Sequence, residues 1–221
     1  MKKIVIIPAY NEQGSIVETI KDIKTNAPKF DYIVINDCSK DNTLKICREK
    51  GIHVLNLPIN LGIGGAVQTG YLYAYRNNYD IAVQFDGDGQ HDAKFLEMMA
   101  ETLERDKLDM VIGSRFIENE GFQSSAVRRF GIRFFEVFIK ILFGQRITDA
   151  TSGMRMCNRK VMELFIKDYP KDYPEPETVS RLLRHKYKVK EVPVVMRERQ
   201  AGVSSICLLY TSDAADDMQC V

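Results

Sequence analysis

Residues 81–90 read Ile81-Ala82-Val83-Gln84-Phe85-Asp86-Gly87-Asp88-Gly89-Gln90. The apolar run predicts a buried strand, and the ligand crevice of an open α/β sheet lies where such strands end. Asp86 and Asp88 are close enough to repel each other unless a cation lies between them. Carboxylate and amide oxygens suit a hard divalent ion such as Mg²⁺ or Mn²⁺. An ordinary Asp-Gly turn accounts for the same residues, so this segment alone leaves both interpretations open.

Around this segment the chain alternates between strand and helix patterns. The predicted strands of the first half are residues 4–7, 32–35, 52–55, 81–85 and 110–112. The predicted helices are residues 15–24, 42–50, 64–76 and 93–104. This alternation predicts an α/β fold with a mostly parallel central sheet and helices on both faces. The loops that begin near Pro8, Asp37, Asp86 and Gly113 should then meet at one edge of the sheet.

The second half is less regular. Its patterns predict helices at residues 128–143, 161–165 and 178–184 and a strand at residues 189–195. No repeat or Pro/Gly/Ser-rich linker interrupts the chain, which predicts a single domain over residues 1–206. The composition changes abruptly after Ile206. Residues 207–221 resemble a translated adapter or read-through tail more than native domain sequence, so they do not enter the fold prediction.

The bulk composition excludes some classes of function. The 221 residues include 31 Lys and Arg and 30 Asp and Glu, and a net charge of +1 gives no field that would attract nucleic acid. Five cysteines without a zinc or redox spacing predict a reducing, cytoplasmic location. No run of 18 apolar residues occurs, so no helix is expected to span a bilayer. Any membrane contact is expected to be peripheral, on the inner face of the cell membrane.

Other predicted strands also end in polar residues. After the first strand, the Tyr10 ring can cover a base and Glu12 can bind a sugar hydroxyl, although a plain connecting loop explains both residues. Asp37 follows the second strand and can accept hydrogen bonds from a base or a ribose. The glycine-rich residues 60–66 precede a helix whose first amides favour phosphate, or they allow that helix to pack closely on the sheet. A dinucleotide fingerprint would follow the first strand, so an NAD site is excluded.

A local basic cluster stands out in this near-neutral chain. Arg115 ends the fifth predicted strand, and Arg128, Arg129 and Arg133 follow it. Guanidinium groups bind phosphate oxygens in a bidentate way, although a solvated helix face explains any one of these arginines equally well. Residues 128–143 are apolar around most of the predicted helix. This pattern is typical of a deeply buried helix or of one that lies in a membrane interface.

Acids in the second half supply candidates for a general base. Asp149 lies in the polar segment 148–155, where it can act as a base, bind a sugar hydroxyl or simply stabilise a turn. Glu177 lies at the start of a predicted helix, where acids also favour the helix dipole. Residues 197–205 form a basic loop that can close over phosphates, or a disordered terminal segment.

Seven short motifs follow one another along the chain. They are Pro-Ala-Tyr-Asn-Glu at 8–12, Asn-Asp-Cys-Ser-x-Asp-x-Thr at 36–43, Asn-x-Gly-x-Gly-Gly at 60–65, Asp-Gly-Asp-Gly-Gln-His at 86–91, Gly-Ser-Arg at 113–115, Asp-x-Thr-Ser-Gly-x-Arg at 149–155 and Arg-x-x-Gly-x-Ser at 199–204. In this order they resemble family 2 glycosyltransferases of the GT-A fold, in the branch of dolichol-phosphate mannose synthase and bacterial polyprenyl-phosphate glycosyltransferases. The resemblance extends from about residue 3 to residue 206.

The resemblance implies a role for each motif. It implies a nucleotide-sugar donor bound by Pro8, Tyr10, Glu12, Asp37 and Gly65, a metal bound by Asp86, Asp88 and Gln90, and phosphates met by Arg115, Arg129 and Arg199. Residues 1–115 would bind the donor, and residues 116–206 the acceptor. Two positions depart from the family pattern: Cys38 replaces a usual glycine, and Ser205 replaces the lysine of the lipid-phosphate enzymes.

The implied activity is inverting transfer of a sugar from a UDP- or GDP-sugar, in the synthesis of a cell-envelope or polysaccharide glycan. A cation and Arg115 would stabilise the charge on the leaving diphosphate. The preferred acceptor is a polyprenyl phosphate, which is already an anion and needs no strong base. The alternative acceptor is a glycan hydroxyl, which needs a base: Asp149 first, Glu177 second. A non-catalytic nucleotide-sugar-binding module is a further alternative, whereas Pro-Ala-Tyr-Asn-Glu argues against a sugar nucleotidyltransferase.

Overall fold

A computed structural model describes residues 1–117, 139–171 and 174–197 of the chain. The strands are β1 (Lys3–Ala9), β2 (Asp31–Asn36), β3 (Val54–Asn56), β4 (Ile81–Gln84), β5 (Met110–Ser114), β6 (Arg155–Asn158) and β7 (Val189–Pro193). The helices are α1 (Ile16–Asn26), α2 (Thr43–Glu49), α3 (Gly62–Arg76), the 3₁₀ turn η1 (Ala93–Phe95), α4 (Leu96–Arg105), α6 (Arg159–Lys167) and α7 (Pro174–Arg184). Residues 139–143 are also helical.

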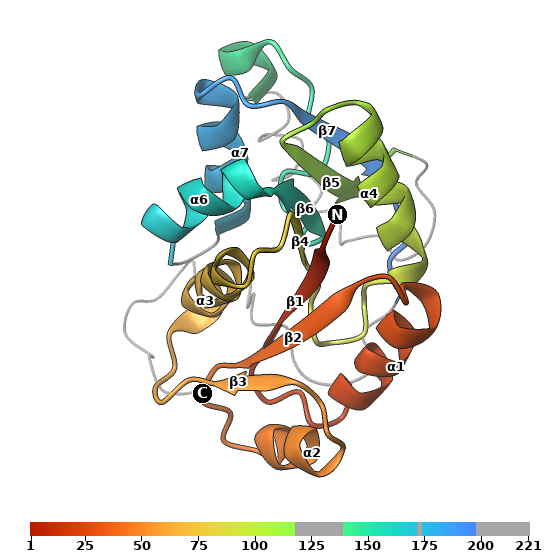
Figure 1. Cartoon of the computed structure of the whole chain (residues 1–221). Coiled ribbons are helices and arrows are strands. Elements are labelled where there is room, and N and C mark those ends of the chain that lie inside the picture. Colours follow the sequence, from red (N-terminus) through yellow and green to blue (C-terminus); the bar gives the residue numbers. More distant parts are fainter. Residues whose placement is uncertain (118–138, 172–173, 198–221) are drawn as a thin grey trace, which may run out of the picture.

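These strands form one seven-stranded sheet in the order β3-β2-β1-β4-β6-β5-β7. Neighbouring strands are parallel, except that β6 runs antiparallel to both β4 and β5. Helices lie on both faces: α1 and α4 on one side, and α3, α6 and α7 on the other (Figure 1). The predicted mostly parallel α/β architecture is therefore confirmed. Strands from both halves of the chain join the same sheet.

The apolar residues of β1 alternate between two cores, as the period of a strand requires. Ile4 and Ile6 belong to the cluster under α3 and α6, whereas Val5 and Ile7 belong to the cluster under α1 and α4. All four side chains are almost completely buried. Burial on both faces explains why this strand reads as a continuous apolar run in the sequence.

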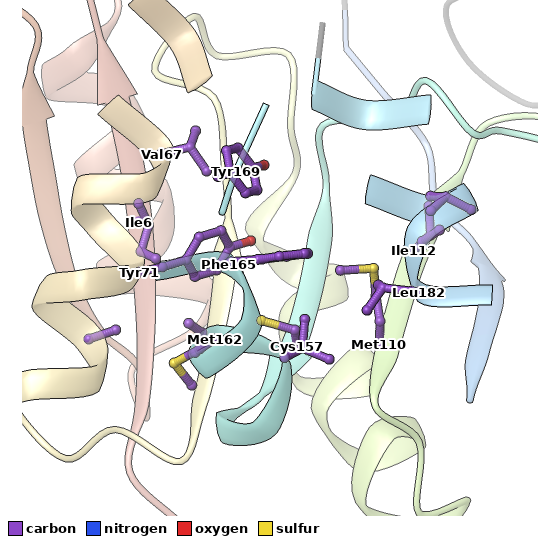
Figure 2. Close-up of a cluster of buried hydrophobic side chains, with 14 of the residues drawn as sticks. Ile6, Val67, Tyr71, Met110, Ile112, Cys157, Met162, Phe165, Tyr169 and Leu182 are labelled. Atoms are coloured by element: carbon purple, nitrogen blue, oxygen red, sulfur yellow. The ribbon is translucent and has the colours of Figure 1, made fainter. Parts of the chain in front are cut away.

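Aromatic rings fill the core between α3 and α6. Tyr71 comes from α3, Phe165 from α6, and Tyr169 follows α6; all three face one another in Figure 2. The ring centroids of Tyr71 and Phe165 are 5.1 Å apart, and those of Phe165 and Tyr169 are 5.0 Å apart. Tilted and edge-on contacts at this distance stabilise the core beyond simple burial. These ring contacts fix α6 against α3, the helix that begins next to the loop after β2.

The sequence did not predict β6. Residues 155–158 are few, and two of them, Arg155 and Asn158, are polar, so they lack the apolar run by which the other strands were recognised. Arg155 is nevertheless buried and pairs in register with Gln84 of β4. The helix predicted at 178–184 begins earlier, at Pro174, because proline fits the first turn of a helix.

Some predictions fall outside the described residues. They include most of the helix predicted at 128–143 and the tail 207–221. The described end of that helix exposes Ile141 and Leu142 and buries Ile139. In the described ranges, no helix has both the length and the apolar content needed to cross a membrane.

Gly70 allows α3 to lie close to β1, and this contact gives a test of the packing. A Cβ at Gly70 would lie 2.1 Å from Cγ2 of Ile6, which is buried. We expect Gly70→Ala to lower the free energy of unfolding by about 1–3 kcal/mol through overpacking, measured by urea denaturation. Helix propensity alone predicts the opposite sign, a gain of about 0.5–1 kcal/mol. A stabilised Gly70→Ala variant would therefore contradict this packing.

Candidate functional site

The carboxyl ends of four strands meet at one edge of the sheet. β1, β2 and β4 are parallel neighbours, and β5 has the same direction because both β4 and β5 pair antiparallel with β6. Contacts between the loops support this: the Asp37 N–H donates to the Ala9 carbonyl at 2.9 Å, and a Cβ on Gly87 would lie 3.2 Å from the Pro8 carbonyl. The prediction that these loops gather at one edge is confirmed.

The turn after β4 holds both acids of the opening segment. The Asp86 N–H donates to Nδ1 of the buried His91 at 3.0 Å, and the Asp86 side chain is 35% exposed. Asp88 is buried, and its Oδ1 accepts the N–H of Gln90 at 2.9 Å. Gly89 takes a positive φ of 78°, a conformation that favours glycine. These bonds fix the turn while one carboxylate remains open to solvent.

Gly153, just before β6, keeps the Asp86 carboxylate uncovered. A Cβ on Gly153 would lie 2.8 Å from Oδ2 of Asp86, so any side chain there would occupy the space in front of this oxygen. The space and the oxygen donors both fit a hard cation that also binds phosphate. Within the described ranges, no three His, Cys, Asp or Glu side chains are grouped so that they alone could hold a metal. A metal here would need Gln90, water or ligand oxygens as well.

Asp37, the predicted ligand of the nucleoside, is bonded to the start of α3. Its Oδ1 accepts the N–H of Leu61 at 2.7 Å, and the N–H of Gly62 also donates to this carboxylate. Burial raises the pKa of Asp37, whereas these two N–H bonds act in the opposite direction. Asp37 thus fixes the loop that carries the glycine-rich segment. Its neighbour Cys38 has a φ of 57°, a backbone conformation that favours glycine.

Tyr10 and Glu12, the other predicted nucleoside ligands, follow β1. The Tyr10 side chain is exposed, as a stacking residue at an open site would be. The Glu12 carboxylate accepts the Ser15 hydroxyl at 2.7 Å, and the Glu12 N–H donates to Thr43 Oγ1 at 2.9 Å. These contacts tie the loop after β1 to the first turns of α1 and α2. The roles of both residues toward a nucleoside stay predictions.

The glycine-rich segment serves close packing at two positions. A Cβ on Gly64 would lie 2.1 Å from the Pro170 carbonyl oxygen, so Gly64 is where α3 meets the segment after α6. A Cβ on Gly65 would lie 2.5 Å from Cβ of Leu61, which is also too close. Packing therefore explains both glycines, and the predicted contact of Gly65 with the donor stays a prediction.

Arg115 and Asp149 form a buried ion pair. Arg115 donates through Nε to Asp149 Oδ2 and through Nη2 to Oδ1, both at 2.7 Å. Arg115 also donates to Thr151 Oγ1 at 3.1 Å. Asp149 is fully buried, and Arg115 is 9% exposed. Both carboxylate oxygens of Asp149 are therefore bonded to Arg115, so this geometry gives no support to Asp149 as a base.

Glu191 of β7 holds the chain that carries Asp149. Its carboxylate accepts the N–H groups of Thr148 and Asp149, each at 2.7 Å. Burial raises the pKa of Glu191, while these N–H bonds act in the opposite direction. Sequence reasoning missed Glu191, because a single acid in an edge strand looks like an ordinary solvent-facing residue. It is the residue that places Asp149 opposite Arg115.

A second cluster, also missed in the sequence, lies beside Asp86. The buried Arg155 donates to the carbonyls of Ser152, Ala150 and Glu175 and to Thr178 Oγ1, all within 2.7 Å. The Gln84 amide donates to the Glu175 carboxylate and, at 3.5 Å, to Asp86 Oδ1. The structure therefore brings Glu175 toward Asp86.

The charge environment of Glu175 distinguishes it from the other glutamate of the same turn. Burial raises the pKa of Glu175; Arg155 acts against this, and the Asp86 carboxylate adds to it. Glu177, the predicted second candidate base, lies two residues further on and is exposed. The repeated Pro-Glu at 174–177 could have drawn attention to both acids, but it could not distinguish them. Arg129 and Arg199 lie outside the described residues.

Comparisons with known proteins show the family of this chain. The family profile described as "Glycosyl transferase family 2" matches residues 4–165. The undecaprenyl-phosphate mannosyltransferase of Micrococcus luteus is 28% identical over 93% of this chain and 88% of its own length. The UDP-N-acetylglucosamine–dolichyl-phosphate N-acetylglucosaminyltransferase of Methanococcus voltae is 30% identical over 86% of this chain and 83% of its own length.

A solved structure has the same fold. Glucosyl-3-phosphoglycerate synthase from Mycobacterium tuberculosis, in complex with Mn²⁺, UDP and phosphoglyceric acid, superposes with a TM-score of 0.69. The two sequences are 17% identical, and the match covers 91% of this chain and 72% of that one. The family profile spans well over half of the chain and contains the β4 turn with its two acids. The protein therefore belongs to glycosyl transferase family 2 and is a glycosyltransferase.

Proposed function

We propose that this glycosyltransferase moves a sugar from a UDP- or GDP-sugar to a polyprenyl phosphate, with inversion at the anomeric carbon. The observation that carries the proposal is the open Asp86 carboxylate, which Gly153 leaves uncovered at the sheet edge where the loops after β1, β2 and β5 also meet. Relatives named for undecaprenyl-phosphate and dolichyl-phosphate acceptors support a lipid phosphate as the acceptor. The division into a donor half, 1–115, and an acceptor half, 116–206, is part of this proposal.

The residues after β4 would hold a divalent cation, Mg²⁺ or Mn²⁺. Asp86, Asp88 and Gln90 would be its ligands from the protein, with phosphate oxygens of the donor completing the set. When bound, the cation stabilises the negative charge that develops on the leaving nucleoside diphosphate. The Mn²⁺ named with the structurally similar synthase supports a divalent ion without deciding between the two metals.

The chain's own residues would orient the donor. The exposed Tyr10 would cover the base, with Pro8 beside it, while Glu12 and Asp37 would bind the nucleoside. The amide groups at the start of α3, near Gly65, favour an anion. Arg129 and Arg199 would bind phosphate oxygens through bidentate hydrogen bonds.

Arg115 and Asp149 have a different role in this proposal. Because each oxygen of Asp149 accepts a bond from Arg115, Asp149 would orient that guanidinium instead of accepting a proton. Nη1 of Arg115, which makes no bond to the residues that the structure describes, would face phosphate. Lipid phosphate is already anionic, so its attack needs no general base.

Glu175 favours a second candidate function, transfer to a glycan hydroxyl. It is a half-buried acid near Asp86, and desolvation raises its pKa, as suits a general base. The exposed Glu177 lacks this environment.

For a lipid acceptor, we propose peripheral membrane contact through residues 130–143, of which the described part exposes Ile141 and Leu142.

A screen of UDP- and GDP-sugars with polyprenyl phosphate and Mn²⁺, scored by release of nucleoside diphosphate, tests the proposed function. We expect one sugar donor to be turned over, and Asp88→Ala to lower that rate by about 100-fold or more, because charge stabilisation by a metal is worth several kcal/mol. Asp168→Ala is the control, because the side chain of Asp168 is 69% exposed. Full activity of Asp88→Ala would refute the metal assignment, and transfer to soluble glycans alone would refute the lipid acceptor.

The paired variants Glu175→Gln and Glu177→Gln separate the two acceptor types. With a glycan hydroxyl as acceptor, Glu175→Gln should lose about 100-fold or more in kcat, whereas Glu177→Gln should not. A base acts only when it is ionised, and burial raises the pKa of Glu175 above its ordinary value of 4.5. The rate should therefore fall as the pH decreases through this raised pKa. With a lipid phosphate, neither variant should change the rate by more than a few-fold. Equal losses in both variants would contradict this assignment.

The buried Arg115–Asp149 pair predicts a large effect on stability. We expect Asp149→Asn to lower the free energy of unfolding by about 3 kcal/mol, because it leaves a buried guanidinium without its counter-charge. Asp168→Asn breaks an exposed ion pair with Arg181 and should cost less than about 1 kcal/mol. Chemical denaturation measures both. Similar small losses in the two variants would show that the Asp149 pair is not the buried pair described.

A further inference from the structure

Arg197 follows β7 and reaches the turn that carries the proposed metal ligands. Its backbone N–H donates to the Gln90 carbonyl at 2.8 Å. Its guanidinium contacts Asp22 Oδ2 through Nη1 at 3.2 Å and Asp92 Oδ1 through Nη2 at 2.9 Å. A single residue thus joins the last strand, α1 and the loop after β4.

The two acids bonded to Arg197 also hold the main chain where this loop ends. Asp22 Oδ2 accepts the N–H of Ala93 at 3.1 Å, and Asp92 Oδ1 accepts the N–H of Lys94, also at 3.1 Å. Their side chains are only 13% and 8% exposed. Lys94 Nζ also contacts Asp92, at Oδ2 and 3.2 Å, whereas the planar fork of Arg197 bonds to both carboxylates at once and so links Asp92 to Asp22.

A pocket of about 240 Å³ lies behind the loop, lined by Gly89, His91 and Arg197, together with Asp22 and other residues of α1. Thr19 Oγ1 of α1 donates to the Gly87 carbonyl at 3.2 Å. Residues 87–89 and 91–93 are themselves buried, and His91 packs against the Phe85 ring. To this packing Arg197 adds the contacts that tie Gln90 and Asp92 to α1 and to the segment after β7.

We propose that Arg197 is a positioning residue that holds the 86–92 loop in the shape needed to bind the divalent cation. The inference rests on the proposed function, because it concerns the metal assigned to Asp86, Asp88 and Gln90. The backbone N–H of Arg197 bonds to the carbonyl of Gln90, and the guanidinium holds that backbone in place by bonding to Asp22 and to Asp92 at the end of the loop. Arg197 does not touch the proposed ligands' side chains.

Titration of Mn²⁺ into the full chain with UDP and, separately, with GDP tests the inference by calorimetry. We expect Arg197→Met to raise the Kd for Mn²⁺ by about 10-fold or more, as loss of residues that orient metal ligands does. Arg197→Lys should be intermediate, because one ammonium group cannot bridge two carboxylates as a fork does. Arg105→Met is the matched control: it also removes an ion pair, with Asp106 at 2.9 Å, but on the exposed surface.

Hydrogen exchange of the metal-free protein supplies a readout without metal. We expect faster exchange in residues 86–94 of Arg197→Met and unchanged exchange there in Arg105→Met. If Arg197→Met does not fold, Arg197→Lys carries the comparison. An unchanged Kd in a variant of Arg197, while the wild type binds Mn²⁺, overturns this inference alone. Absence of Mn²⁺ binding to the wild type with either nucleotide overturns the proposed metal site and this inference with it.

Discussion

The parallel pairing of β1 with β2 and β4 is the constraint on which the rest of the structure depends. It places three strand ends at one edge, and each end carries polar residues that a strand interior could not tolerate. Because both faces of these strands are closely packed, a slip in their register would disrupt two cores at once. The positions of Asp37 and Asp86 therefore follow from the packing of residues such as Ile6 and Val83, which take no part in any chemistry.

The antiparallel strand β6 adds what the parallel strands cannot provide. It returns the chain from the second half to the middle of the sheet, between β4 and β5. Its approach brings Gly153 over Asp86, and its buried Arg155 holds the start of α7, so that Glu175 comes near the same carboxylate. The site is thus assembled from both halves of the sequence, although its first half supplies most of the recognisable motifs.

The elements with a clear period could be predicted from the sequence, and those defined by buried polar contacts could not. β1, β2 and β4 have continuous apolar runs, so their place in a parallel sheet and the gathering of their loops followed from pattern alone. β6 has only four residues, two of them polar, so it lacks the apolar run by which a strand is recognised in the sequence. Glu175 and Glu177 are equivalent in the sequence, and only the fold leaves Glu175 half-buried and Glu177 exposed. Similarly, no local pattern could pair Arg115 with Asp149, 34 positions away.

In the proposed function, Asp86 and Asp88 hold a divalent cation against the donor diphosphate. Anomalous scattering from crystals of the full chain grown with Mn²⁺ and UDP or GDP would locate this cation. We expect a manganese peak within bonding distance of carboxylate oxygens of Asp86 or Asp88, with the nucleotide's phosphates on its other side. A bound nucleotide whose phosphates lie at Arg115 with no manganese beside the β4 turn, or a peak at other acids, would contradict it.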